Sequence, residues 1–315
     1  MFDVLIFLGG VGIFLYGIKI MGQGLESSAG DKLKNILNKV TSKKITGVLI
    51  GLFVTAIIQS SSATTVMVVS LVNAGFLNLT QATGVIMGAN IGTTVTSLLL
   101  TLNLSDIAPV FVFIGIIMIM FFKKELINNI GEITSGFGLL FVGMNMMSNS
   151  MTPLQNSPYF TNLILSVNNP FFGIIIGLVF TAIIQSSSAS IGILQALGGK
   201  GLLPIDFAVY ILYGQNIGTV VTALLSTIGS KANSKRAAII HLLFNVIGTF
   251  IFVTLTLLTP FTEILELISD KTEIQISAAH IIFNIVNTIL LFPFSDKLVT
   301  ISRKIVPDKK RDIYS

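Results

Sequence analysis

The four-residue motif Gln-Ser-Ser-Ser occurs twice in the chain, at 59–62 and at 185–188, each time inside an apolar run. A turn that interrupts an apolar helix leaves unpaired carbonyl groups before it and unpaired N–H groups after it. The N–H groups and serine hydroxyls can bind an anion, whereas the carbonyl and glutamine amide oxygens can bind a hard cation. Two facing turns would therefore form a polar chamber for an oxyanion with adjacent monovalent cations. The candidate anion ligands are Gln59, Ser60, Ser61, Ser62, Gln185, Ser186, Ser187 and Ser188.

A second repeated motif, Asn-Ile-Gly-Thr, follows each Gln-Ser-Ser-Ser, within GANIGTTVT at 88–96 and GQNIGTVVT at 214–222. On a helix, the Asn and Thr side chains of each copy fall three residues apart on one face. We interpret them as further sodium or substrate ligands, and hydrogen bonding between hairpin and helix is the alternative. These residues are Asn90, Thr93, Thr96, Asn216, Thr219 and Thr222.

The composition places these motifs in a membrane. Hydrophobic residues make up 52% of the chain and charged residues 10%, against about a quarter charged in soluble domains. Several apolar runs reach the roughly 20 residues that a helix needs to cross the hydrocarbon, and they do not alternate as barrel strands would. The predicted fold class is an all-α polytopic membrane protein. We assign the net charge of +5 to membrane-flanking anchors and not to nucleic-acid binding.

The chain aligns with itself at an offset of 126 residues. Residues 47–64 and 173–190 align without a gap, with 13 of 18 positions identical. The same offset superimposes the two Asn-Ile-Gly-Thr motifs and also maps GIFLYGIKIM onto GLLFVGMNMM. Three separated blocks in one register indicate two homologous halves, followed by an additional C-terminal segment.

Equivalent loops of the two halves differ in charge. The loop at 25–46 contains five lysines, whereas 151–172 contains no charged residue. By the positive-inside rule the first loop is cytoplasmic and the second external, so we expect an inverted repeat. The segments that flank each Gln-Ser-Ser-Ser are too short to span the membrane alone and predict re-entrant helical hairpins. With about seven full crossings in addition, the N-terminus lies outside and the C-terminus in the cytoplasm.

The predicted organisation has four parts. They are a first inverted repeat at 1–132 with its hairpin at 47–75, a second at 133–236 with its hairpin at 171–198, a C-terminal helix pair at 237–296, and a basic cytoplasmic tail at 297–315. We expect the helices at 4–24 and 133–149, together with the C-terminal pair, to form a scaffold. The hairpins would move relative to this scaffold.

This organisation, with interrupted helices in inverted repeats, is typical of secondary transporters. No Arg, Lys, Asp or Glu lies centrally in any predicted crossing. The predicted crossings therefore lack the buried carboxylate expected of a proton pump and the series of arginines expected of a voltage sensor. Helix ends and co-bound cations would balance the charge of an oxyanion, which favours reciprocal coupling between anion and cation.

With both duplicated motifs in this order, the chain resembles the type II sodium-dependent phosphate cotransporter family. The resemblance extends to two His-x-x-Phe-Asn motifs, HLLFN at 241–245 and HIIFN at 280–284. It implies that both Gln-Ser-Ser-Ser motifs surround phosphate, with Na+ as the coupling ion and no cofactor. Many bacterial relatives carry a C-terminal cytoplasmic PhoU-like domain; since this sequence ends at Ser315, we expect a bacterial member in which that domain is absent or was removed. The implied sodium ligands are Gln59, Asn90, Thr93, Thr96, Gln185, Asn216, Thr219 and Thr222.

The expected function is sodium-coupled symport of inorganic phosphate across the plasma membrane by alternating access. The expected partners are phosphate, Na+ and membrane lipid, without nucleic acid, and a homodimer is left open. Transport of another oxyanion is the nearest alternative, and a passive anion channel is the next. An intramembrane serine enzyme is disfavoured because the serines lack a Gly-x-Ser-x-Gly elbow and a nearby His–Asp pair. We expect a structural role, hydrogen bonding between helices, for His241, Asn245, His280 and Asn284.

Overall fold

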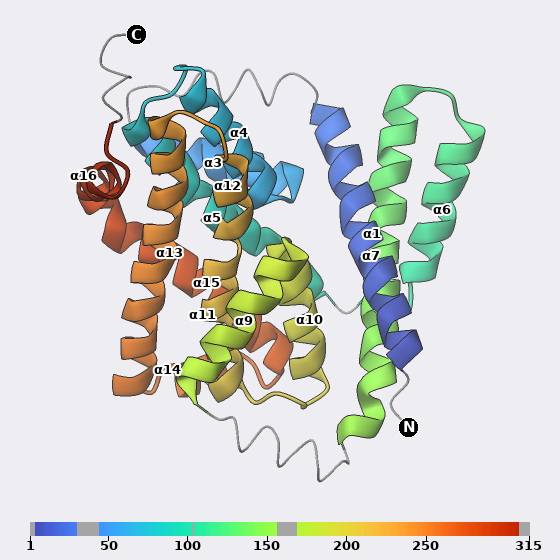
Figure 1. Ribbon diagram of the computed structural model, residues 1–315. Helices are drawn as coiled ribbons and strands as arrows, with labels where there is room; N and C mark the ends of the chain where they lie inside the picture. The colour runs from blue at the N-terminus through green and yellow to red at the C-terminus, as the bar shows by residue number, and fades with distance from the viewer. Residues whose placement is uncertain (1–3, 30–43, 103, 156–168, 309–315) are drawn as a thin grey trace.

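The computed structural model describes residues 4–29, 44–102, 104–155 and 169–308, which form helices and turns without a strand. Figure 1 shows their arrangement. The helices are α1 (Val4–Ala29), α3 (Lys44–Ile58), α4 (Ser61–Asn73), α5 (Leu79–Leu100), α6 (Ala108–Phe121), α7 (Glu125–Gln155), α9 (Pro170–Ile184), α10 (Ser187–Gly199), α11 (Ile205–Gly218), α12 (Val220–Ser226), α13 (Ala232–Leu258), α14 (Phe261–Ile268), α15 (Thr272–Leu291), the 3-10 helix η1 (Phe292–Phe294) and α16 (Ser295–Ile305).

Within the described part of the chain, six helical segments are long and apolar enough to cross a membrane. The prediction of an all-helical multi-pass membrane protein is therefore confirmed. The one predicted crossing that is not among these six segments, at 107–122, corresponds to α6, which has only 14 residues. At 1.5 Å per residue α6 is about 21 Å long, shorter than the roughly 30 Å hydrocarbon core. Its exposed Phe113 and Met120 suit contact with lipid.

Helices α1, α6 and α7 form a group of their own, seen together at one side of Figure 1. Helix α1 runs along α7, and α6 packs on α7 with an edge-on contact between Phe111 and Phe137 at 5.4 Å between ring centroids. Phe14 of α1 is fully buried and lies against Gly192 of α10. The group therefore contacts the rest of the bundle partly through the second hairpin.

The two hairpins, α3–α4 and α9–α10, enter the bundle from opposite ends. Lys44 at the start of α3 forms an ion pair with Asp296 at 2.6 Å, just beyond the C-terminal end of α15. Gly198 at the end of α10 packs against Thr272 and Ile276 at the start of α15. Because the 20 residues of α15 extend about 30 Å, the turns of the two hairpins point towards each other.

Each hairpin packs closely on the helix that carries the next polar motif. A Cβ atom on Gly88 of α5 would overlap the carbonyl oxygen of Val48 in α3. At the equivalent position of the second half, a Cβ atom on Gly214 of α11 would overlap the carbonyl oxygen of Ile174 in α9. Small residues permit such close helix contacts in a membrane, where dispersion contacts stabilise the pair. The two halves therefore share one mode of packing.

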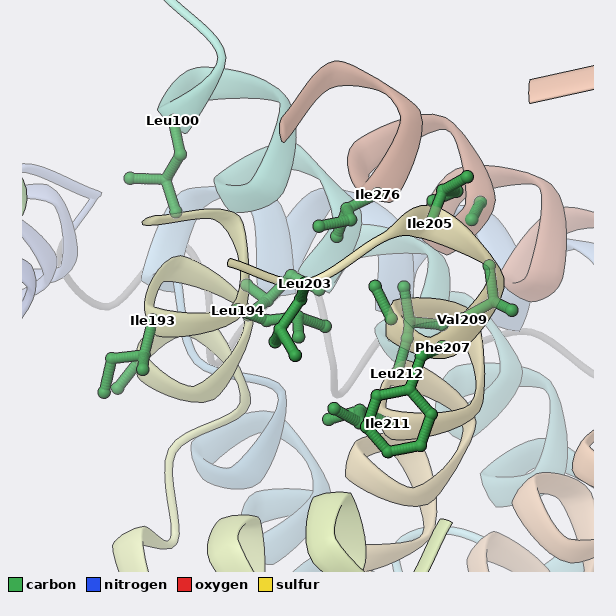
Figure 2. Packing of buried hydrophobic residues seen from close by; sticks show 14 of the residues in the cluster. Leu100, Ile193, Leu194, Leu203, Ile205, Phe207, Val209, Ile211, Leu212 and Ile276 are labelled. Carbon is green, nitrogen blue, oxygen red and sulfur yellow. The ribbon is translucent and has the colours of Figure 1, made fainter. Parts of the chain in front are cut away.

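Helices α13 and α15 pack against the hairpins and their partner helices. Helix α15 contacts α5, α10 and α11, and α13 contacts α4, α5 and α11. Figure 2 shows Ile276 of α15 in the same apolar cluster as Leu194 of α10 and Leu212 of α11. The C-terminal pair therefore lies against both hairpins, with α13 on α4 and α15 on α10.

Candidate substrate and ion site

The Gln-Ser-Ser-Ser sequence forms the same backbone turn in both halves. Gln59 has a φ of 59° and Gln185 a φ of 56°, in the left-handed region that residues other than glycine rarely adopt. The N–H of Gln59 still bonds the carbonyl of Thr55 at 2.8 Å, so the left-handed residue ends the helix. This conformation costs about 1–3 kcal/mol in a residue other than glycine. Strain at two equivalent positions motivates a functional hypothesis for the turns.

The first serine of each motif caps the helix that follows. Ser60 Oγ accepts a hydrogen bond from the N–H of Ala63 at 3.1 Å, and Ser186 Oγ accepts one from Ala189 at 3.2 Å. The N–H groups of the second and third serines have no acceptor within their own helix. They lie at the positive end of the helix dipole. Each turn therefore presents N–H groups that are suited to bind an anion.

The two turns contact each other between the hairpins. Ser61 Oγ of the first turn lies 3.4 Å from Ser187 Oγ of the second. Next to this contact, Ser188 Oγ donates to Thr96 Oγ1 at 3.2 Å, and Thr96 Oγ1 donates to Gln59 Oε1 at 2.8 Å. Side chains from both hairpins and from α5 thus form one hydrogen-bonded group.

A cavity of about 330 Å³ opens at the first turn. Gln59, Ser60 and Ser186 line it, so the cavity reaches both polar motifs. Lys19 and Glu26, in the C-terminal half of α1, line its other side. Because these two charges have opposite signs, this wall of the cavity carries almost no net charge. It therefore supplies little positive charge to balance the negative charge of the predicted anion.

The second half places its equivalent residues differently. Gln59 is only 6% exposed, whereas Gln185 is exposed. Thr222 is the counterpart of Thr96, but its buried hydroxyl has no hydrogen-bond partner. The second turn therefore lacks the bond that fixes the Gln59 side chain. Ser62, on the first turn, is partly buried.

The asparagines of the two Asn-Ile-Gly-Thr motifs share one side-chain conformation. Nδ2 of Asn90 donates to the carbonyl four residues earlier at 2.8 Å, and Nδ2 of Asn216 does the same at 3.1 Å. Since the amide nitrogen is turned back onto its own helix, the amide oxygen points away and is available to a cation. The hydroxyls of Thr93 and Thr219 also donate to their own helices.

The two histidine motifs bond mainly within their own helices. Asn245 and Asn284 donate to the carbonyls of His241 and His280, at 3.1 and 2.9 Å. Nδ1 of His280 lies 3.3 Å from Oγ of Ser97 in α5, whereas the ring nitrogens of His241 have no hydrogen-bond partner. Asn287, which lies outside both motifs, forms the link between α13 and α15 that we expected from them.

Two residues near the site were not singled out from the sequence. Gln195 of α10 is 2% exposed, and its Nε2 donates to the carbonyls of Ser97 and Glu273, both at 3.0 Å. Oγ of Ser97 also lies 3.3 Å from Oγ of Ser277. These bonds join α5, α10 and α15. The available signals were the single amide in the apolar run of α10 and the position of Ser97 directly after Thr96.

Opposed hairpins that meet at polar turns within a multi-pass helical bundle are organised like the sites of secondary transporters. The chain matches the Na+/Pi-cotransporter family over residues 13–149 and again over residues 143–269. It therefore belongs to this family, whose members are transporters and not enzymes. The family model thus matches the chain twice, with the two ranges overlapping at 143–149.

Relatives cover the chain to different extents. YjbB of Salmonella typhimurium, whose name gives inorganic phosphate export as a provisional function, is 27% identical over 311 residues, 98% of this chain and 57% of YjbB. The uncharacterized protein YqeW of Bacillus subtilis is 30% identical over 297 residues, 94% of this chain and 96% of YqeW. Sodium-dependent phosphate transport protein 2A of Rattus norvegicus is 33% identical over 97 residues, 30% of this chain and 15% of that protein. The chain thus spans little more than half the length of YjbB. No solved structure matches it.

Proposed function

We propose that the chain is a sodium-coupled transporter of inorganic phosphate that holds its substrate between the two Gln-Ser-Ser-Ser turns. The observation that carries this proposal is the contact between the turns, with 3.4 Å between Ser61 Oγ and Ser187 Oγ. Two helix N-termini and their serine hydroxyls converge there, which suits a tetrahedral oxyanion with several acceptor oxygens. The anion ligands are the eight residues of the two motifs.

Sodium ions supply the positive charge that this site needs. The cavity next to the turns has one Lys and one Glu in its wall, Lys19 and Glu26, so protein charge leaves the anion largely unbalanced. Carboxamide and hydroxyl oxygens are suitable ligands for a hard cation. We assign the sodium ions to the glutamines of the turns and to the Asn and Thr side chains of the Asn-Ile-Gly-Thr motifs. Binding of each ion then favours binding of the other.

The protein would lie in the plasma membrane with its N-terminus outside and its C-terminus in the cytoplasm. The halves at 1–132 and 133–236 are related as inverted repeats, and each hairpin is re-entrant. In this orientation the cavity beside Gln59 and Lys19 opens towards the cytoplasm, so the chain is in an inward-open state. The gradients of sodium and phosphate determine the direction of net flux, which accommodates relatives named for export and for sodium-dependent transport.

The test is phosphate flux in liposomes that contain the purified protein. Labelled phosphate should accumulate when a sodium gradient is imposed and should not when potassium replaces sodium. The double variant Ser61→Ala, Ser187→Ala removes two hydroxyls from the site and should raise the phosphate KM by about 10- to 100-fold, since bonds to charged groups contribute about 1.5–3 kcal/mol. Ser70→Ala, on an exposed position of α4, is the matched control and should leave flux unchanged.

Two results would contradict the proposal. Flux that persists without sodium and does not saturate would indicate a passive anion channel. Sulfate or arsenate that competes much better than unlabelled phosphate would indicate a transporter of another oxyanion. A double serine variant with wild-type KM would refute the site assignment alone.

A further inference from the structure

Helix α16 lies across one end of the bundle. It follows α15 after η1, in which Pro293 has no backbone N–H to continue a helix. Figure 1 shows α16 nearly end-on, whereas α13 is seen from the side. Leu298 and Val299 of α16 belong to the same apolar cluster as residues at the beginnings of two other helices. These are Leu79, the first residue of α5, and Ala237, in the second turn of α13. Helix α16 therefore lies where two candidate membrane crossings begin, close to a membrane surface.

The side chains of α16 form three groups around the helix. The first group is buried against the protein and consists of Ser295, Leu298, Val299 and Ser302. The second is apolar and exposed: Ile301 is 39% exposed, and Ile305, one turn later on the same face, is 53% exposed. Phe294, two turns before Ile301, continues this face and is 47% exposed. We refer to Phe294, Ile301 and Ile305 as the apolar face of α16.

The third group is charged, and two lysines of this group border the apolar face. Lys297 precedes Ile301 by four residues and Lys304 follows it by three, so both lysines are neighbours of Ile301 on the helix surface. We call these two lysines the basic edge. Nζ of Lys297 lies 4.9 Å from the ring centroid of Phe294, which holds this ammonium group against the apolar face. At about 3.6 residues per turn, Arg303 lies on the opposite side of the helix, where it is exposed.

The acidic residues beside α16 are already paired. Asp296 forms an ion pair with Lys44 at 2.6 Å, and Asp308 forms one with Arg236 at 2.7 Å. Both cations come from other helices, α3 and α13. Among the residues that the structure describes, the two lysines of the basic edge have no acidic partner. The basic edge is therefore available to an external anion.

This distribution of side chains matches the layers of a membrane surface. An interfacial helix places its apolar face among acyl chains, its cationic side chains at the level of the lipid headgroups and its polar side in water. The apolar face, the basic edge and Arg303 follow this order around α16. Because α16 lies at the end of two crossings, lipid already surrounds its apolar face, whereas a protein partner would first have to displace that lipid. Cationic side chains close to a membrane attract anionic lipids.

We propose that α16 lies in the membrane interface and binds the headgroups of anionic lipids through Lys297 and Lys304. Ile301 and Ile305 insert among the acyl chains, and Arg303 faces water. This inference goes beyond the proposed function, because it depends neither on the substrate nor on sodium. Since Asp296 of α16 pairs with Lys44 at the start of α3, bound lipid would also hold the beginning of the first hairpin.

The first experiment measures how deep α16 lies in liposomes. The chain contains no cysteine, so Ile301→Cys, Ile305→Cys and Arg303→Cys can each carry a single fluorophore. A nitroxide on the lipid should quench the fluorophore at 301 and 305 about fivefold more efficiently than the fluorophore at 303, since an interfacial helix buries only one face. Iodide in the aqueous phase should give the reverse order.

Two results of this experiment would overturn the proposal. Equal quenching by iodide at all three positions would place α16 in water. A fluorophore at 301 that neither quencher reaches would show that protein, such as a second copy of the chain, covers the apolar face.

The second experiment measures lipid selectivity at the same place. Nitroxide-labelled phosphatidylglycerol is titrated into the fluorophore-labelled Ile301→Cys protein in detergent, with labelled phosphatidylcholine as the neutral comparison. Lys297→Gln together with Lys304→Gln should weaken phosphatidylglycerol binding by about 30-fold, or roughly fivefold per lysine, and should leave phosphatidylcholine binding unchanged. Arg303→Gln removes the same charge from the same helix and is the matched control, which should change the affinity by less than about twofold.

Inorganic phosphate as a competitor, compared with chloride at equal ionic strength, distinguishes a lipid from a free anion. It should not displace phosphatidylglycerol, because the apolar face also contributes to lipid binding. Displacement by phosphate, or an equal loss of affinity in Arg303→Gln, would overturn the proposal. All of these variants replace exposed side chains, and neither experiment uses transport. Absence of sodium-driven phosphate flux would refute the proposed function and leave this inference intact.

Discussion

The first hairpin is closed by a hydrogen bond that the second hairpin lacks. Thr55 Oγ1 donates to Thr64 Oγ1 at 2.9 Å across the first hairpin, whereas the equivalent hydroxyls of Thr181 and Ser190 in the second are buried without a partner. The same contrast holds for the turns. The Gln59 side chain is buried and bonded to α5, whereas Gln185 is exposed.

This difference separates what the motif encodes locally from what tertiary packing adds. Both glutamines adopt a left-handed backbone conformation, and the first serine of each motif caps the helix that follows. The local sequence therefore determines the backbone of the turn. The hydrogen bonds across and around the turn do not follow from it, since nearly identical sequences form them in one half only. The cavity at the first turn is lined by Gln59, Ser60 and Ala63 of the first hairpin but only by Ser186 of the second, in keeping with this difference. If the chain alternates access as proposed, the opposite state would exchange the roles of the two hairpins.

The largest expected effect concerns a feature that the hairpins share. Gly88→Ala and Gly214→Ala each place a Cβ atom onto a backbone carbonyl of the crossing helix. Overpacking of this kind costs about 3 kcal/mol or more where backbone must move. Thermal unfolding of the purified variants should show similar, large losses for both. Gly12→Ala, which has no atom within 4 Å of the added Cβ, is the control. A large loss in one half only would show that the halves do not share their packing.

The next effect measures the asymmetry of the cavity. Ala63 lines the open cavity, whereas its counterpart Ala189 is 0% exposed. The chain contains no cysteine, so a single introduced cysteine is the only reactive thiol. In membrane vesicles, Ala63→Cys should react with a small hydrophilic thiol reagent about tenfold faster or more than Ala189→Cys, because a buried site must first open locally.

The side of the membrane matters in this measurement. Ala63→Cys should react with an impermeant reagent supplied at the cytoplasmic face. Equal rates for the two cysteines, or faster reaction of Ala63→Cys from the outside, would contradict an inward-open first hairpin. A shift towards labelling of Ala189→Cys when sodium and phosphate are added would indicate that the hairpins exchange roles.

A smaller effect tests the bond that holds the first turn. Thr96→Val removes the donor to Gln59 Oε1 and one acceptor for Ser188 Oγ, which leaves Gln59 Oε1 without this donor while Ser188 Oγ keeps the carbonyl oxygen of Gln59 at 3.5 Å. It should lower the free energy of unfolding by about 1–3 kcal/mol. Thr222→Val removes a hydroxyl that has no partner and should be neutral or slightly stabilising. Unfolding in choline buffer, without sodium or phosphate, measures both. Equal losses would mean that the second turn is held in the same way as the first.

The sequence alone predicts the framework of the molecule well. The repeated motifs and the length of the apolar runs predicted both hairpins, and the structure places them at α3–α4 and α9–α10. The apolar run at 107–122 also predicted the bounds of α6, Ala108–Phe121, to within one residue at each end. The contacts of the C-terminal pair were not predicted, since they depend on individual side chains such as His280, whose Nδ1 lies near Oγ of Ser97.

Parts of the site depend on packing that periodicity does not encode. Gln195 lies in an apolar run, and nothing in its spacing indicates that it joins α10 to α5 and α15. The role of Asn287 is similar, because it lies outside the recognisable His-x-x-Phe-Asn motif. The asymmetry of the hairpins has no sequence signal at all. It depends on the packing around each turn, which the nearly identical sequences of the two turns do not encode.

The smallest expected effect compares the hydroxyls within each hairpin. Thr55→Val breaks the bond to Thr64, but Thr64 Oγ1 still donates to the carbonyl of Ser60 at 3.1 Å. The loss should therefore be only about 1 kcal/mol, the net value of an ordinary hydrogen bond. Thr181→Val removes a hydroxyl without a partner and should not destabilise the inward-open state. If sodium and phosphate favour the proposed opposite state, in which Thr181 and Ser190 would form a hydrogen bond, Thr181→Val should then cost more stability than Thr55→Val. Thermal unfolding with and without both ligands measures the reversal, and an order that ligands leave unchanged would count against an exchange of roles between the hairpins.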